Sequence, residues 1–179
     1  MGLIIIGLIW CYFIYKEEQL IEKYKKAVEV YQKSIMVNYN YIGYSYFKLK
    51  DYNKSIEAYQ KSLEINPKKD EAYVCLFEIK LIQNQLLDKM LEKKYIELFS
   101  NQTESFMVYE MLKTIEDVAN NKETNIESWK SKYKNIGLYK WNWDYNKLDD
   151  WIKTIKDKQI KTKLLKAIEV FKSHNPANG

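Results

Sequence analysis

The sequence predicts an all-α fold, a right-handed array of seven or eight helices arranged as consecutive hairpins. Only two prolines and five glycines interrupt the 179 residues, and long stretches of charged and apolar residues without turn signals favour helices over a sheet. A helical segment also recurs along the chain. The apolar fraction of 46% is large enough to build a core, which argues against an intrinsically disordered chain.

The recurring segment occupies residues 24–35 (YKKAVEVYQKSI) and 52–63 (YNKSIEAYQKSL), which are identical at seven positions. Each copy places a tyrosine, a small residue, a second tyrosine and a serine on one helix face, at spacings of three and four. These residues are Tyr24, Ala27, Tyr31 and Ser34 in the first copy and Tyr52, Ser55, Tyr59 and Ser62 in the second. Small residues on this face let a neighbouring helix approach closely, so the chain repeats a structural unit.

The second copy belongs to a longer pattern. A stripe with Gly43 and Tyr46 precedes it, Lys50-Asp51 separates the two helices, and Asn66-Pro67 ends the second one because proline disfavours the helical state of the preceding residue. Residues 36–69 therefore resemble one tetratricopeptide repeat. The matching positions are Gly43, Tyr46, Asp51-Tyr52, Ser55, Tyr59, Ser62, Leu63 and Asn66-Pro67. The resemblance implies an α-solenoid of helical hairpins over residues 17–99, with degenerate repeats on either side of this one.

The N-terminal residues 3–15 (LIIIGLIWCYFIY) contain no charge, and a helix that is apolar on all sides is typical of a lipid contact. The run is shorter than the roughly 20 residues that cross a bilayer, but Trp10, Tyr12 and Tyr15 fit an interfacial aromatic belt. We expect residues 1–16 to be a hydrophobic membrane-anchor helix at a bacterial inner membrane. The lysines that follow favour a cytoplasmic domain. A buried first helix and a signal peptide are the alternatives.

Helical patterning continues through residues 100–174, which we expect to form a helical C-terminal cap on the array, followed by a tail at residues 175–179. Asn101-Gln-Thr-Glu104 and Thr124-Asn-Ile-Glu127 are capping boxes, and Asp144 and Asp157 are candidate N-caps. Trp141 and Trp143 lie in a predicted loop. Such a pair either plugs the core of a small helical domain or forms a ligand cage.

Residues with catalytic or ligating chemistry are sparse. The one histidine, His174, has no partner cluster, the glycines are isolated, and no nucleophile accompanies a base. We expect no enzyme activity, no metal and no cofactor. All 29 basic residues are lysines, and the absence of arginine forks makes specific nucleic-acid recognition unlikely on chemical grounds.

The resemblance implies that the first helix of each repeat lines a concave groove that receives an extended peptide or a helix. Carried over by position, the groove residues are Val37, Asn40, Tyr44, Phe47, Lys48, Glu71, Val74, Glu78 and Leu81. This mixture predicts an interaction scaffold for an apolar peptide or amphipathic helix with a basic residue facing Glu78. The alternative is that Tyr44 and Phe47 pack inside the protein.

A second interpretation places function at the C-terminal helices. From Ser128 onward the chain has 12 lysines and five acidic residues. Lys158, Lys161 and Lys166 lie near one face of the predicted last helix, and Lys153 and Lys156 precede it. Such a surface predicts contact with anionic lipid or nucleic acid that weakens steeply with salt.

Overall fold

The computed structural model describes residues 2–86, 88–101, 103–133 and 143–173, with the backbone alone at 2–12, 27, 29, 31–33, 36 and 103. These residues form eight α-helices and no strand, which confirms the all-helical prediction. The helices are α1 (Gly2–Lys48), α2 (Tyr52–Ile65), α3 (Asp70–Ile82), α4 (Lys89–Phe99), α5 (Thr103–Ala119), α6 (Ile126–Tyr133), α7 (Asn146–Thr154) and α8 (Lys158–Ser173).

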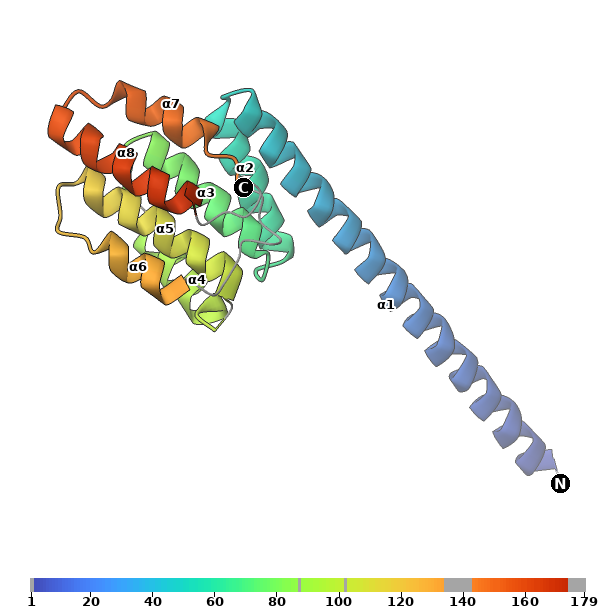
Figure 1. Cartoon of the computed structure of the whole chain (residues 1–179). Helices are drawn as coiled ribbons and strands as arrows, with labels where there is room; N and C mark the ends of the chain where they lie inside the picture. Colours follow the sequence, from blue (N-terminus) through green and yellow to red (C-terminus); the bar gives the residue numbers. More distant parts are fainter. Residues whose placement is uncertain (1, 87, 102, 134–142, 174–179) are drawn as a thin grey trace.

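The helices from α2 to α8 form one body, from which α1 projects (Figure 1). The C-terminal end of α1 packs against α2, and α2 packs against α3. The contacts continue from α3 to α5 and from α5 to α8, so these three helices form the middle of the body. α4 and α6 contact one side of this row, and α7 contacts α3 and α8. The C-terminal helices therefore share one hydrophobic core with the repeat helices.

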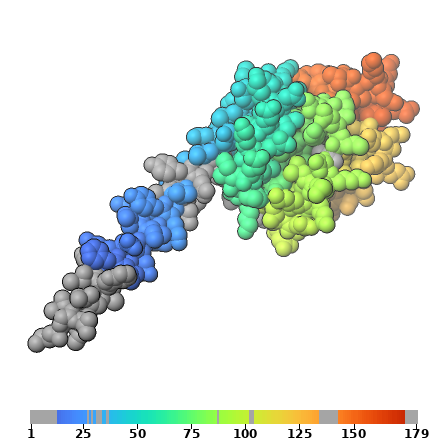
Figure 2. Space-filling view, turned by 180° about the vertical axis from the view of Figure 1, so that it is seen from behind, coloured from blue at the N-terminus to red at the C-terminus, as the bar shows by residue number. Residues whose placement is uncertain are grey.

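The discrete N-terminal helix expected at residues 1–16 is not supported. Residues 2–48 form one continuous helix of 47 residues, because no proline or glycine interrupts the sequence between Lys16 and Ile42. The first repeat copy at 24–35 lies within the projecting part of this helix, as the space-filling view also shows (Figure 2). Within the described part of the chain, no helix has a stretch that is both long and apolar enough to cross a membrane.

The hairpin of α1 and α2 follows the pattern of small and aromatic residues. A Cβ atom added at Gly43 would lie 3.0 Å from the ring of Tyr59, so only a glycine lets α2 approach α1 this closely. Ser55, which is fully buried, donates a hydrogen bond of 2.7 Å from its Oγ to the carbonyl oxygen of Gly43. The repeated face of residues 52–63 is thus the face that contacts the preceding helix.

Several predicted helix boundaries are confirmed by local hydrogen bonds. The chain turns at Lys50, whose φ is 62°, and the Asp51 carboxylate then accepts from the amide of Lys54 at 3.3 Å. Asp157 caps α8 by accepting from the amides of Gln159 and Ile160. α4 begins at Lys89, where the Asp88 carboxylate accepts from the amide of Met90.

The start of one other helix differs from the sequence prediction in detail. At α6 the side chain of Asn125, not that of Thr124, accepts from the amide of Ser128. Trp141, His174 and the tail at 175–179 lie outside the described residues.

The tight contact at Gly43 generates a stability prediction. Replacing Gly43 by valine should lower the free energy of unfolding by about 2 kcal/mol, because the new side chain overlaps the Tyr59 ring in a packed interface. The measurement is urea unfolding followed by circular dichroism. Ser45→Val, two residues away on the exposed side of the same helix, should change stability by less than about 0.5 kcal/mol. Equal losses in both variants would contradict the proposed role of Gly43.

Candidate functional site

A cavity of about 530 Å³ lies where α1, α3 and the segment preceding α7 meet, and we call it the α1–α3 pocket. Its lining combines aromatic rings with carboxylates. The lining residues are Asn40, Tyr41, Tyr44, Phe47, Tyr59, Asp70, Glu71, Cys75, Glu78, Trp143 and Asp144. A mostly apolar hollow with a few converging polar groups is the usual form of a ligand site, so this pocket is the candidate functional site.

Five of the nine groove residues predicted from the sequence line this pocket. They are Asn40, Tyr44 and Phe47 from α1, and Glu71 and Glu78 from α3. Tyr44 is exposed, whereas Phe47 is buried in the core. These five predicted residues therefore line a pocket. That they bind a partner stays a prediction.

The other four predicted residues lie elsewhere. Lys48 is beside the pocket, where it is ion-paired with Asp144. Val37 is exposed on the projecting part of α1. Val74 and Leu81 are buried in the hydrophobic core, because α3 is covered by neighbours on most of its circumference, unlike the exposed first helix of an isolated repeat. These two side chains cannot reach a partner without unfolding.

Glu78 is the most unusual polar group of the pocket. Its side chain is 3% exposed, and its Oε1 atom has no hydrogen-bond partner among the described residues. Burial raises the pKa of this carboxyl well above its ordinary value, and the negative charge of Asp144 acts in the same direction. The ammonium groups of Lys48 and Lys147 oppose that shift. A buried carboxyl of this kind gains from a cationic partner that supplies both charge and hydrogen bonds.

Asp144 lines the pocket from the segment that precedes α7. Burial acts to raise its pKa, but the hydrogen bond from Lys48, with another from the amide of Asn146, outweighs burial and holds the pKa below its ordinary value. The hydrogen bond to Asp144 in turn raises the pKa of the Lys48 ammonium. The two groups therefore stay charged near neutral pH and tie the end of α1 to the start of α7.

The opposite rim is also held by polar contacts. Asn40 donates from Nδ2 to Oε2 of Glu71 at 3.1 Å, and Glu71 is ion-paired with Lys69. The Oδ1 atom of Asn40 is buried and has no hydrogen-bond partner within the described residues. The Glu71 carboxylate is thus already engaged, whereas Oε1 of Glu78 is buried and has no hydrogen-bond partner among the described residues.

Cys75 and Tyr59 also line the α1–α3 pocket. Burial raises the pKa of the Cys75 thiol to about 12, although a hydrogen bond with Tyr59 opposes this shift. The thiol is therefore protonated at neutral pH and is a poor nucleophile. Burial also raises the pKa of the Tyr59 hydroxyl. Both side chains present a neutral surface to anything that enters the pocket.

The sequence analysis did not anticipate the contribution of Trp143 and Asp144 to this site. Trp143 is buried in the core, as the core interpretation of the tryptophan pair expects, and it also borders the pocket. Both residues lie about a hundred positions after α1 in the chain, and no local pattern indicates which earlier helix they contact. The opposite charges of Lys48 and Asp144 are the only sequence signal of this contact.

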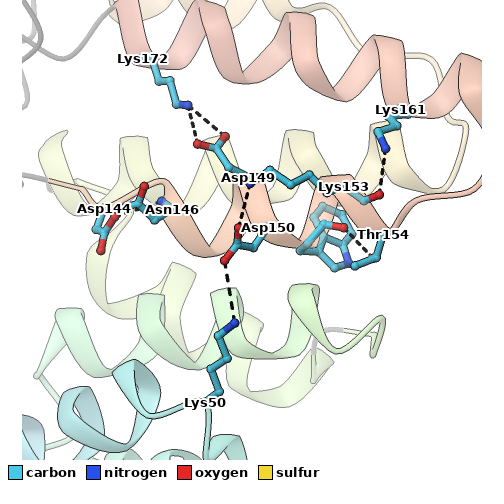
Figure 3. A network of polar contacts seen from close by, with 10 residues as sticks. Lys50, Asp144, Asn146, Asp149, Asp150, Lys153, Thr154, Lys161 and Lys172 are labelled. Atoms are coloured by element: carbon cyan, nitrogen blue, oxygen red, sulfur yellow. Dashed lines mark hydrogen bonds and ion pairs between the residues drawn. The ribbon is translucent and has the colours of Figure 1, made fainter.

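The C-terminal lysines are partly engaged within the protein (Figure 3). Lys153 is paired with Asp150 at 3.0 Å, and Lys161 donates to the carbonyl oxygen of Lys153. Lys172 binds Asp149 at 2.7 Å and fastens α8 to α7. On the other side of α7, Asp150 lies 4.0 Å from Lys50. Some of the lysines that were expected to face a ligand therefore make contacts within the protein instead.

A second hollow of about 840 Å³ lies between the α5–α6 connection and α8. Its charged lining mixes Lys122, Lys163 and Lys166 with Glu123 and Glu127. All five are exposed, and Lys163 donates to Asn121. Exposed charges of both signs are well solvated and give little selectivity, so the α1–α3 pocket is the better candidate.

Glu78 generates a prediction on stability and pH. The pKa of Glu78 in the folded state lies above the unfolded value of about 4.3. Between these two pKa values the folded state binds more protons than the unfolded state. The free energy of unfolding therefore falls as pH rises through that window. Glu78→Gln should therefore raise the free energy of unfolding at pH 7 by at least about 1 kcal/mol, with the gain vanishing near pH 4. Urea unfolding at several pH values measures this. Glu57→Gln on the exposed face of α2 should show the pH profile of the wild type, and a pH-independent gain for Glu78→Gln would refute the assignment.

In a comparison with known proteins, one segment of this chain matches a family model. Residues 39–69 match the family model of the tetratricopeptide repeat, and they form the hairpin of the α1 end and α2 described above. No curated protein and no solved structure matches the chain. The remaining described helices continue the array in a manner consistent with such repeats. The chain is therefore a helical-array protein that carries a tetratricopeptide repeat at residues 39–69.

Proposed function

We propose that this chain is a protein-interaction module that binds a peptide or helix by accepting a cationic side chain in the α1–α3 pocket. The general role follows from the repeat, since tetratricopeptide repeats are protein-binding units. The observation that carries the specific proposal is Glu78, a buried carboxyl whose Oε1 lacks a hydrogen-bond partner among the described residues and which borders an open pocket. A lysine or arginine head group would supply the missing donor.

The walls of the pocket suit the rest of such a side chain. Tyr44, Phe47, Tyr59 and Trp143 offer apolar surface to an aliphatic stem. Aromatic faces also attract cations, and the pocket already shows this interaction, since the Lys48 ammonium lies 5.4 Å from the centre of the Tyr44 ring. A long cationic side chain therefore matches the pocket both along its stem and at its head group.

The rim of the pocket supports a contact with a longer ligand. Tyr41 and Tyr44 are exposed on α1, and partly exposed tyrosines are frequent anchors in protein interfaces because they combine a large apolar area with a polar tip. Asp70 and Glu71 add negative charge at the edge. An acidic rim repels a carboxylate, so the ligand we propose has a basic residue and not a C-terminal carboxylate as its main anchor.

We also propose, independently of the pocket, that residues 3–15 attach the chain to a membrane. The support for this attachment is the uncharged sequence of that run. Because α1 is continuous, the helix would hold the pocket away from the bilayer, at roughly 35 Å over the residues between Tyr15 and Tyr39. The side of the membrane follows only from the lysines after the run, which favour a cytoplasmic body.

The alternative function, binding of anionic lipid or nucleic acid by the C-terminal lysines, has less support. Lys153 and Lys161 make contacts within the chain, which reduces the charge available on that surface. Lys158 and Lys166 are exposed, as is Lys156. Binding that collapses between low and high salt would favour this alternative, whereas a buried ion pair at Glu78 is screened much less.

The cationic anchor can be tested with an array of synthetic 12-residue peptides in which one lysine or arginine is flanked by apolar residues. We expect binding to be lost when the basic residue is replaced by norleucine, and to weaken at least tenfold in Glu78→Gln. Glu57→Gln, with the same charge change on the exposed face of α2, should bind as the wild type does. Affinity should also rise with pH through the raised pKa of Glu78, because the ion pair requires the carboxylate. Binding that is unaffected by norleucine or by Glu78→Gln would exclude this anchor.

The aromatic rim gives an independent prediction. Tyr44→Ala should weaken binding of the same peptides about tenfold, because it removes an exposed aromatic anchor, while circular dichroism shows unchanged helicity. Leu49→Ala, at another exposed apolar position beside the same helix, is the control and should have no effect. Phe47 is unsuitable for this test because it is buried in the core. An equal effect of both variants would argue against a specific role of Tyr44.

A further inference from the structure

The N-terminal part of α1 projects from the body (Figures 1 and 2). Many of its apolar side chains are exposed. Twelve large apolar residues between positions 13 and 42 are 42–69% exposed. A soluble monomer rarely presents a continuous apolar face of this length, and such a face usually marks an interaction surface. What distinguishes this face is the regular order of its residues.

Five β-branched residues follow one another at a strict interval of seven. They are Ile14, Ile21, Val28, Ile35 and Ile42, and we call them the heptad stripe. All five are 42–53% exposed. The stripe covers four heptads. Apolar residues at the first and fourth positions of three to four successive heptads indicate a coiled coil, and the stripe supplies the first of these two positions.

The contact between α1 and α2 does not account for this seven-residue interval. Gly43, which meets α2, follows Ile42 directly, so its direction differs by about 100° around the helix. The heptad stripe therefore lies beside the α2 contact and not in it. A straight helix lets such a stripe drift by about 20° per heptad, and only supercoiling with another helix keeps it in one line.

The neighbours of the stripe extend it into an interface. In each heptad the residue before the stripe is apolar or small, with Phe13, Leu20 and Tyr41 among them. Tyr24 and Tyr31 occupy the second seam position, while Glu17 and Asn38 occupy it at the two ends. Between residues 14 and 35 the helix has five lysines and four glutamates, so two such helices have little net charge with which to repel each other.

The internal repeat provides a second observation. Residues 24–35 share the contact face of residues 52–63. In the second copy, Ser55, Tyr59 and Ser62 are buried against neighbouring helices. In the first copy, the corresponding residues with described side chains, Tyr24 and Ser34, are exposed. A face with the composition of a helix contact is therefore open in the single chain.

We propose that the heptad stripe is the interface with a second copy of this chain, as a parallel two-stranded coiled coil of the α1 helices. β-branched residues at the first seam position favour two parallel strands. About sixteen seam and flanking positions lie in four heptads, and at the usual interface density they bury on the order of 1,000–1,300 Å² in total, which reaches the size of a specific dimer. The two bodies lie on opposite sides of the pair, and the two runs of residues 3–15 lie at the same end.

The test is sedimentation equilibrium of the full chain at micromolar concentration, comparing Val28→Glu with Val30→Glu. Val28 belongs to the stripe and is 52% exposed, and Val30 is a valine of the same helix outside the stripe that is 62% exposed. We expect the wild type and Val30→Glu to have twice the chain mass of 21.6 kDa. Val28→Glu should be monomeric, with a dissociation constant raised roughly a hundredfold or more, because each copy would bury a carboxylate.

Other outcomes would overturn the proposal. A monomeric wild type excludes the dimer, and association that both glutamate variants leave unchanged assigns it to another surface, including residues 3–15. A Val28→Glu chain that stays dimeric but no longer floats with phosphatidylglycerol vesicles assigns the stripe to lipid.

Orientation is tested by disulfide formation in a Cys11→Ser, Cys75→Ala background. Val28→Cys should crosslink to its counterpart in a parallel dimer, whereas Lys26→Cys should not. Crosslinking of neither position in a chain that is still dimeric would exclude the parallel arrangement.

Discussion

The close approach of α1 and α2 at Gly43 is the contact on which the rest of the structure depends. The ring of Tyr59 lies on the backbone of α1 where a side chain would otherwise stand, and the hydrogen bond from Ser55 to the Gly43 carbonyl fixes the rotation of α2 about its axis. Because α1 is one continuous helix, this crossing sets two things at once. It places Asn40 and Tyr44 at the pocket, and it sets the direction in which the N-terminal part of α1 leaves the body.

A cluster of aromatic rings then holds the body behind that crossing. Tyr95 of α4 is its centre, with ring centroids of Tyr73, Phe77 and Tyr109 at 5.3–5.5 Å. These rings come from α3 and α5, so three helices are joined by contacts that prefer tilted and edge-on geometries. The consequence is a well-supported α3, and this helix carries Glu78 into the pocket on a rigid element.

The pocket and the projecting helix show how one element can serve two surfaces. Along α1, the residues toward α2 and α3 and the heptad stripe lie on neighbouring faces of the helix, and the two surfaces meet at Tyr41. Glu78 has a cost to folding, since its carboxyl is buried without a complete set of hydrogen bonds. A group that opposes stability and borders a cavity is a reasonable sign of a binding role, because ligand contacts can offset what folding leaves unsatisfied.

The sequence by itself determined the features that depend on neighbouring residues. Helix content follows from the scarcity of breakers, the α1–α2 hairpin from the spacing of Gly43, Ser55 and Tyr59, and the helix starts from caps such as Asp51 and Asp157. These signals act within a few turns of helix, so they can be interpreted along the chain.

Only the tertiary structure decided the features that depend on distant contacts. It merged the expected anchor segment, the first repeat copy and the first helix of the repeat at 36–69 into one helix over residues 2–48. It buried Val74 and Leu81, which the repeat pattern alone had placed in a groove, because α5 and α7 pack on α3. It brought Asp144 to Lys48 across nearly a hundred residues. Burial and charge pairing of this kind are set by which surfaces pack together, and helix periodicity specifies the faces that can pack but not their partners.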